Sequence, residues 1–158
     1  MEVRFPQVEG SSLSGTPHRI PGTLAGDVNL LLIAFRQWQQ SDVDTWVPVA
    51  EELAEHTPGF RAYELPVISQ VYRPVSGFID GGMRGGIPDQ DVREATITLY
   101  INRKQFLDDL EITAVNAIVP MLVTRDGEIL WRTTGRRTDD DEARLRQAVA
   151  ASGSPGLP

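Results

Sequence analysis

The sequence predicts an α/β protein whose mixed sheet carries helices on both faces. The first observation is the apolar run VNLLLIAF, Val28 to Phe35, which is typical of a central strand buried on both sides. The second is the alternation of further strand patterns with helical patterns, which favours parallel pairing through right-handed crossovers. The third is a hairpin signal around Asp126-Gly127, which adds an antiparallel pair.

The chain of 158 residues is long enough to bury a core without metal ions or disulfides, and we expect one folded domain. Hydrophobic residues make up 41% and charged residues 23%, as is usual for a soluble globular protein. Composition divides the chain into a loop-rich N-terminal segment over 1–27, a domain over 28–151 and a flexible tail over 152–158. At most one short strand, near Val3–Val8, is expected in the first of these parts.

A helix is predicted directly after the central strand. Ser41 is placed to cap it, with Asp44 three residues on, as in a capping box. Pro48 falls inside this helix and should kink it, because proline removes a backbone hydrogen bond. Apolar residues recur at three and four positions and form one stripe: Val43, Trp46, Val47, Ala50, Leu53 and Ala54.

The rest of the chain continues the alternation of strands and helices. Two strand patterns are separated by a predicted helix and a glycine-rich turn, and a short helix, the hairpin and a last helix follow. In order, these elements are a strand over Arg61–Ile68, a helix around Tyr72–Ile79, a strand over Ala95–Ile101, a helix over Arg103–Leu110 capped by Asn102, a hairpin of Met121–Thr124 with Glu128–Thr133, and a helix from Thr138.

Charge and hydropathy exclude two classes of partner. The net charge is −7 and no basic stripe is present, which argues against nucleic-acid binding. The longest apolar run, Leu30 to Phe35, is far shorter than the roughly 20 residues that span a bilayer, so no direct membrane insertion is expected. The N-terminus lacks the basic flank and apolar stretch of a secretion signal. These features predict a cytoplasmic protein.

The chain contains no cysteine, which excludes disulfides, a thiolate nucleophile, iron–sulfur clusters and cysteine-based zinc sites. No metal and no cofactor is expected. The run Asp139-Asp140-Asp141 lacks the spaced ligands of a calcium loop and fits the acidic first turn of a helix. The stretch GGMRGG lacks the lysine and hydroxyl residue of a phosphate loop, but Arg84 within it is a candidate contact for an anion.

No catalytic residue is predicted. Ser41 or Thr45 as a nucleophile would need a base within hydrogen-bond reach. His56 lies about 20 Å along the predicted helix from Ser41, at ~1.5 Å per residue. The spacing of His18, in the N-terminal segment, does not exclude it.

The C-terminal stretch VPMLVTRDGEILWRTTG resembles the second half of the thioredoxin superfamily. In that superfamily a cis-proline opens a strand that leads through a charged-glycine turn into a second strand. The matching residues here are Val119, Pro120 and Asp126-Gly127. The stretch FPQVEGSSLSG, followed by a buried strand and a tryptophan-containing turn, is similar to peroxiredoxin-like members. The likeness covers about residues 5–150 and implies a thioredoxin-like fold.

A narrower resemblance links AFRQWQQSDVDTWVP, YELPVI and FIDGGMRGGI to the thioredoxin-fold proteins related to the mitochondrial ATP-synthase assembly factor. That family implies an assembly or chaperone-like role. The chain departs from the wider superfamily at the thiols. With Pro48 matched to the proline of the thioredoxin helix, the two cysteine positions fall on Gln40 and Val43, which cannot attack a disulfide or a peroxide. The resemblance therefore implies the fold without the redox activity.

The leading hypothesis is a redox-inactive binding or assembly protein with a protein or peptide partner. In the resembled fold, the backbone before the proline pairs with an extended peptide. The candidate groove consists of Trp38, Gln39, Gln40, Ser41, Asp42, Val119 and Pro120. Three alternative interpretations remain. The groove residues could serve only capping and packing. The chain could be a non-thiol enzyme or a small-molecule (glutathione-like) binder that uses Gln40, Ser41 and Arg84, or a peroxiredoxin relative that forms a homodimer.

Overall fold

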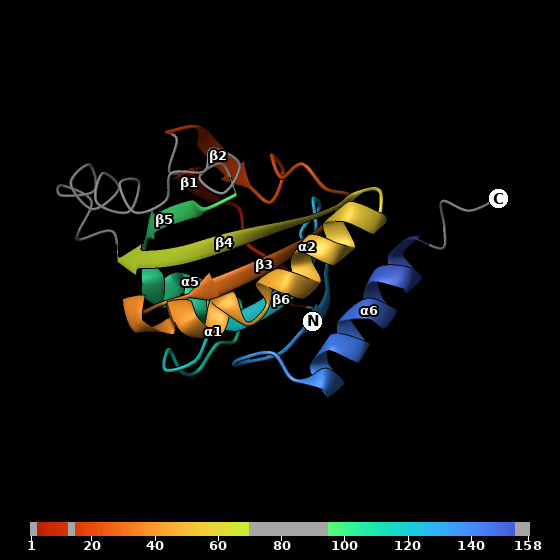
Figure 1. Cartoon of the computed structure of the whole chain (residues 1–158). Helices are drawn as coiled ribbons and strands as arrows, with labels where there is room; N and C mark the ends of the chain where they lie inside the picture. The colour runs from red at the N-terminus through yellow and green to blue at the C-terminus, as the bar shows by residue number, and fades with distance from the viewer. Residues whose placement is uncertain (1–2, 13–14, 70–94, 154–158) are drawn as a thin grey trace.

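The computed structural model describes residues 3–12, 15–69 and 95–153, and these contain one seven-stranded mixed sheet with helices on both faces, as predicted (Figure 1). The strand order across the sheet is β2-β1-β5-β4-β3-β6-β7. The strands are β1 (Val8–Ser12), β2 (Pro17–Ile20), β3 (Val28–Ala34), β4 (Phe60–Ser69), β5 (Ile97–Ile101), β6 (Val119–Thr124) and β7 (Ile129–Arg132). The helices are η1 (Gln37–Gln39), α1 (Gln40–Asp44), α2 (Val47–His56), α5 (Arg103–Asp109) and α6 (Asp139–Gly153).

Strand β3 is the central strand that its apolar run predicted. It pairs in parallel with β4 and antiparallel with β6, and six of its seven residues are buried. Its side chains alternate between two cores: Leu31 and Ile33 pack on the side of α5, and Leu30 and Leu32 pack on the side of α1, α2 and α6. The end of β3 is therefore held on both faces, and it fixes where the following turn begins.

The N-terminal segment contributes more structure than its composition indicated. At most one strand near Val3–Val8 was expected, whereas β1 and β2 form an antiparallel hairpin that joins β5 at one end of the sheet. These strands are polar and partly exposed, so they lack the apolar alternation that marks a strand in sequence. Gly10 permits the pairing, because a Cβ there would meet the Thr98 carbonyl oxygen at 2.7 Å.

The helix after β3 begins earlier than predicted, and it is divided. Ser41 was expected at the N-cap but lies inside α1, because the chain turns into η1 already at Gln37. Helix α2 starts after Trp46, with Pro48 in its first turn, where its missing N–H removes no helical bond. The predicted kink thus takes the form of a break before Pro48. The predicted apolar stripe is largely confirmed by the burial of Val43, Trp46, Ala50 and Leu53.

Other local predictions agree with the structure. The Asn102 side chain accepts a hydrogen bond from the Gln105 amide and caps α5, and the hairpin of β6 and β7 forms around the predicted turn. The helix near Tyr72–Ile79 and the turn that contains Arg84 lie outside the described residues. No helix within the described ranges combines the length and apolarity needed to cross a bilayer.

Candidate functional site

The candidate site lies at the C-terminal end of β3, where the chain turns through η1 into α1. Gln39 organises this turn from the interior, with 0% of its surface exposed. Its Oε1 accepts hydrogen bonds from the backbone amides of Phe35 (2.8 Å) and Arg36 (3.1 Å), and its Nε2 donates to the Val115 carbonyl oxygen (2.8 Å). Gln39 was predicted to line a binding groove. It instead ties the turn to the loop before β6, because its amide bonds to three backbone groups on the two segments.

Trp38 lies on the outer side of the same turn, and its surface is 61% exposed. It is the exposed large hydrophobic residue of the part of the chain that the structure describes. Arg36, Gln37, Gln40 and Ser41 around it are exposed as well. Because Gln39 is anchored on both of its polar ends, the indole is presented from a fixed turn rather than from a loose loop.

Gln40 connects the turn to a carboxylate that was not among the predicted site residues. Its Nε2 donates to Asp44 Oδ1 (2.9 Å) and to Glu64 Oε1 (3.1 Å). Glu64 lies on β4 and is half-buried, and desolvation raises its pKa. The hydrogen bond from Gln40 opposes this shift, and the negative charge of Asp44 adds to it. The available sequence signal was a glutamate in the middle of the strand predicted over Arg61–Ile68.

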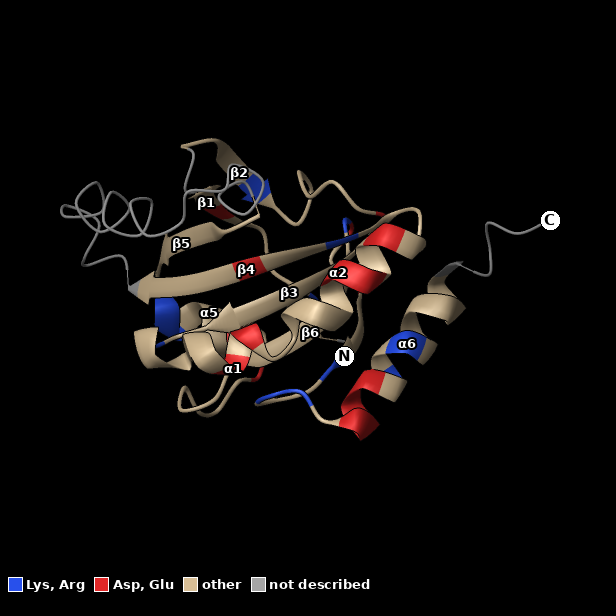
Figure 2. Cartoon of the chain, in the orientation of Figure 1, with Lys and Arg blue, Asp and Glu red and all other residues tan. Residues whose placement is uncertain are grey.

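Asp42 and the hydroxyl of Thr45 hold the segment that follows β7. Asp42 Oδ1 lies 3.3 Å from Arg136 Nε, and Thr45 Oγ1 accepts a hydrogen bond from the Arg137 amide (2.9 Å). Figure 2 shows this basic segment passing beside the acidic helix α1. The Trp46 indole donates to the Gly135 carbonyl oxygen (3.1 Å). These side chains are occupied in fixing one part of the chain to another.

Val119 does not offer the unpaired backbone that the resemblance implied. It is 1% exposed and lies opposite Ile33 in the antiparallel ladder between β6 and β3. The other side of β6 is also occupied, because Gly135 N–H donates to Ile118 O (2.9 Å) and Thr133 N–H donates to Pro120 O (3.0 Å). The expectation of an open strand edge here is wrong, since the chain after β7 fills it.

Pro120 also departs from the resemblance. It is buried within β6 opposite Leu32, and the peptide bond before it is trans. Within the described residues, the cis peptide bond joins Ile20 to Pro21, in a different part of the sheet. The predicted groove therefore divides into an exposed half, around Trp38, and a buried half, at Val119 and Pro120.

The structure also separates His18 from the hydroxyl groups near the turn. His18 lies on β2, and its Nδ1 contacts Thr23 Oγ1 at 3.2 Å. Three strands separate β2 from β3 in the sheet, so the two strands are roughly 19 Å apart at about 4.8 Å per strand. His18 is thus too distant to serve Ser41 as a base, which the spacing in sequence left open.

Similarity to solved structures identifies the type of fold. No family model matches the sequence, and no curated protein matches it. Among solved structures, BsSco, a member of the Sco family of cytochrome c oxidase assembly proteins, has a TM-score of 0.62 at 13% identity and covers 95% of each chain. The pneumococcal exposed lipoprotein thioredoxin of Streptococcus pneumoniae strain TIGR4 has a TM-score of 0.59 at 14% identity, over 92% of this chain and 99% of that one.

A putative thiol:disulfide interchange protein DsbE from Chlorobium tepidum has a TM-score of 0.59 at 15% identity, over 96% of each chain. The fold is thioredoxin-like. This confirms the fold class that the C-terminal motif implied. The chain has this fold without any cysteine, so it lacks the thiolate that disulfide exchange requires.

Proposed function

We propose that this chain is a redox-inactive thioredoxin-fold protein that binds a protein partner in an assembly or chaperone-like role. The contact surface is the exposed half of the site, called here the Trp38 surface. It consists of Arg36, Gln37, Trp38, Gln40 and Ser41. The observation that carries the proposal is the 61% exposure of Trp38.

Two physical arguments support a binding role for Trp38. Tryptophan is enriched among the few residues that dominate the binding energy of protein interfaces, because its large apolar ring is desolvated on contact. An indole held on a turn that Gln39 fixes from the interior also loses little conformational freedom on binding. An exposed tryptophan on an ordered turn is therefore suited to act as an anchor.

The assembly role has two further supports. The motifs around the turn resemble the thioredoxin-fold proteins related to the mitochondrial ATP-synthase assembly factor, and the structural relative BsSco belongs to a family of cytochrome c oxidase assembly proteins. Both are proteins of this fold to which an assembly role is assigned. We infer the same class of role for this chain, with contact through the exposed turn at Trp38 rather than strand addition at Val119.

A second candidate function is small-molecule binding at the polar cluster of Gln40, Asp44 and Glu64. The favouring observation is that one amide nitrogen bridges two carboxylates, of which Glu64 is half-buried and has a raised pKa. Such a cluster suits a cationic or amine ligand that would replace the amide as the shared donor. Titration of Glu64 in the presence of an amine ligand would distinguish this function from partner binding.

The proposal is tested by capturing partners from a lysate of the native organism and then reconstituting each partner with purified protein. Trp38→Ala is compared with wild type, and Glu55→Ala, at an exposed position of α2, serves as the matched control. We expect Trp38→Ala to weaken binding of the reconstituted partner at least about tenfold, as for an interface hot spot. Equal binding by all three proteins would refute the Trp38 surface as the contact.

A further inference from the structure

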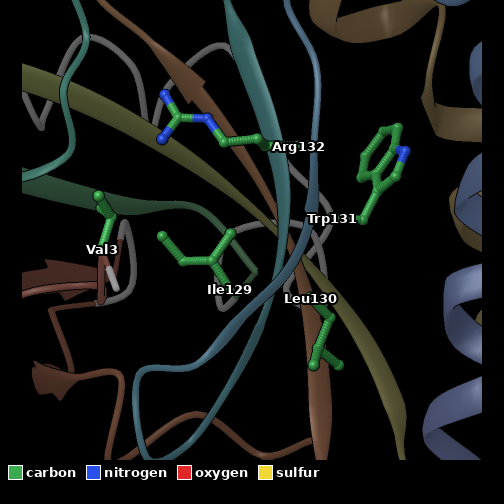
Figure 3. Close-up of a pocket in the computed structure, with 5 residues that line it drawn as sticks. All are labelled: Val3, Ile129, Leu130, Trp131 and Arg132. Carbon is green, nitrogen blue, oxygen red and sulfur yellow. The ribbon is translucent and has the colours of Figure 1, made fainter. Parts of the chain in front are cut away.

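A second surface of the molecule is a hollow beside the outermost strand of the sheet, β7. The hollow has a volume of about 280 Å³ and is lined by Val3 and by β7 itself, from Ile129 to Arg132 (Figure 3). Strand β7 ends the strand order on this side, so its outer edge faces no further strand among the described elements. The hollow is separate from the Trp38 surface and has no part in the function proposed above.

The first part of this edge already holds an extended segment of the same chain. Arg4 pairs antiparallel with Glu128, and Phe5 N–H donates to the Gly127 carbonyl oxygen (2.8 Å). Val3 then forms one wall of the hollow. The edge of β7 is therefore geometrically able to accept a strand, and residues 3–5 cover only its beginning.

Among the residues that the structure describes, none pairs with the edge at Arg132. Arg132 lies opposite Met121, and the next residue, Thr133, donates its N–H to Pro120 O. Because bonded and non-bonded pairs alternate in an antiparallel ladder, the N–H and C=O of Arg132 point away from β6. In the described ranges nothing hydrogen-bonds to these two groups. Unpaired groups of this kind are a template for an added strand.

The charges along the edge favour an acidic occupant. The Arg132 guanidinium donates to the Leu110 carbonyl oxygen (2.7 Å), and that of Arg4 donates to the Asp126 carbonyl oxygen (2.9 Å). Neither arginine forms an ion pair with a carboxylate of the described residues. Asp126 and Glu128 lie at the part of the edge that Arg4 covers, so the open part presents positive charge from Arg132 in a protein of net charge −7.

We propose that the open edge of β7 binds an acidic, extended peptide segment of another protein by strand addition. The peptide backbone pairs with the outward N–H and C=O of Arg132, and one of its carboxylates pairs with the Arg132 guanidinium. One apolar side chain fills the hollow between Val3 and Ile129. A second copy of this chain fits less well, because pairing two β7 edges would bring two Arg132 side chains together.

The test is an NMR titration of the full-length, ¹⁵N-labelled chain with a capped heptapeptide of alternating valine and glutamate. We expect shifts over residues 129–134 and none at the Trp38 indole. A peptide with lysine in place of glutamate is the charge control, and one with N-methylated backbone amides is the strand-pairing control. Both should bind at least about tenfold more weakly.

Two variants locate the charge contact. Arg132→Glu should reduce affinity for the glutamate peptide at least about tenfold and raise affinity for the lysine peptide. Arg4→Glu leaves the Arg132–Leu110 contact in place and should have a smaller effect in the same direction, so the test does not depend on one fold-sensitive variant. Trp38→Ala should bind the peptide as wild type does, which separates this proposal from the proposed function.

Three outcomes would overturn the inference. Equal affinity for the glutamate and lysine peptides would remove the acidic specificity, and shifts confined to another surface would remove the site. No peptide binding, combined with a concentration-dependent dimer in sedimentation that Arg132→Glu dissociates, would assign the edge to a second copy of the chain.

Discussion

The two halves of the predicted groove differ in solvent exposure. The turn after β3 exposes Trp38, whereas the start of β6 buries Val119 and Pro120 within the sheet. The difference lies in where the polar groups of each element are bonded. In the turn, Gln39 bonds to the backbone of Phe35, Arg36 and Val115 from the interior, and the neighbouring indole stays outside. In β6, the carbonyl groups of Ile118 and Pro120 are taken up by Gly135 and Thr133, from the segment after the hairpin.

A sequence motif can thus be present together with its fold while a neighbouring segment pairs with the strand edge and closes it to a partner. In β6 the proline is present, but both sides of the strand are paired, so a partner strand has no access to Val119. The exposed half keeps a large apolar side chain in a position that a partner can reach.

The largest effect is expected from Gln39→Ala. The substitution leaves the amides of Phe35 and Arg36 and the carbonyl of Val115 without their partner, and we expect a loss of about 3 kcal/mol or more in the free energy of unfolding. Urea denaturation measures it. Gln40→Ala, at the exposed neighbouring position, is the matched control and should cost less than about 1 kcal/mol. Equal losses in the two variants would mean that Gln39 does not organise the turn.

A smaller loss is expected where the segment after β7 closes β6. Thr133→Pro removes the N–H that donates to Pro120 O and should lower the free energy of unfolding by roughly 1–3 kcal/mol. Thr134→Pro is the control, because alternation along the ladder points its N–H away from β6. If Thr134→Pro is the more damaging of the two, the pairing that closes the edge has been assigned wrongly.

Glu64 provides a prediction about pH. Its pKa is raised by desolvation, so the folded state holds this proton more tightly than the unfolded chain does. Stability should therefore fall as pH rises from the ordinary glutamate pKa through the raised one. Glu64→Gln carries no charge and should remove this fall, so its gain over wild type should be larger at pH 7 than at pH 4.

The neighbours of Glu64 sharpen the same measurement. Gln40→Ala removes the hydrogen bond that lowers the pKa of Glu64, so the fall in stability should become larger and extend to higher pH. Denaturant unfolding across pH 4 to 8 follows all three proteins. Parallel pH profiles for wild type and Glu64→Gln would show that Glu64 is not the group responsible.

The smallest effect on stability is expected from Trp38→Ala. The indole is 61% exposed, so its removal should change the free energy of unfolding by less than about 0.5 kcal/mol. Trp46→Ala is the contrasting variant, because Trp46 is fully buried against Trp131, and it should cost roughly 3–5 kcal/mol. A large loss from Trp38→Ala would mean that this residue packs rather than binds.

Local patterns were sufficient for the elements that bury apolar residues. The run of β3, the alternation of Tyr63, Leu65 and Val67 in β4, and the hairpin turn before Glu128 all follow from residues adjacent in sequence. The hairpin of β1 and β2 was not predicted beyond one short strand, because polar edge strands carry no such pattern.

The candidate site was predictable only in part, because several of its contacts join residues that are far apart in sequence. The exposure of Trp38 followed from its place in a polar turn. The roles of Gln39, Glu64 and Val119 depend on partners 24 to 86 residues away, at Val115, Gln40 and Ile33. Without those contacts, the position of an amide side chain can be judged only from the residues next to it in sequence. Gln39 and Gln40 show that this is not enough, because one is buried and the other is exposed.

Hydrogen–deuterium exchange on the full chain, with and without a reconstituted partner, would show directly whether the partner contacts the Trp38 surface. We expect the partner to slow exchange over residues 36–41 and to leave residues 118–121 unchanged, because Trp38 is exposed on the first stretch and the second is already paired on both sides. Protection of residues 118–121 with none at 36–41 would contradict this expectation, and would show that the partner uses the strand edge that we find closed.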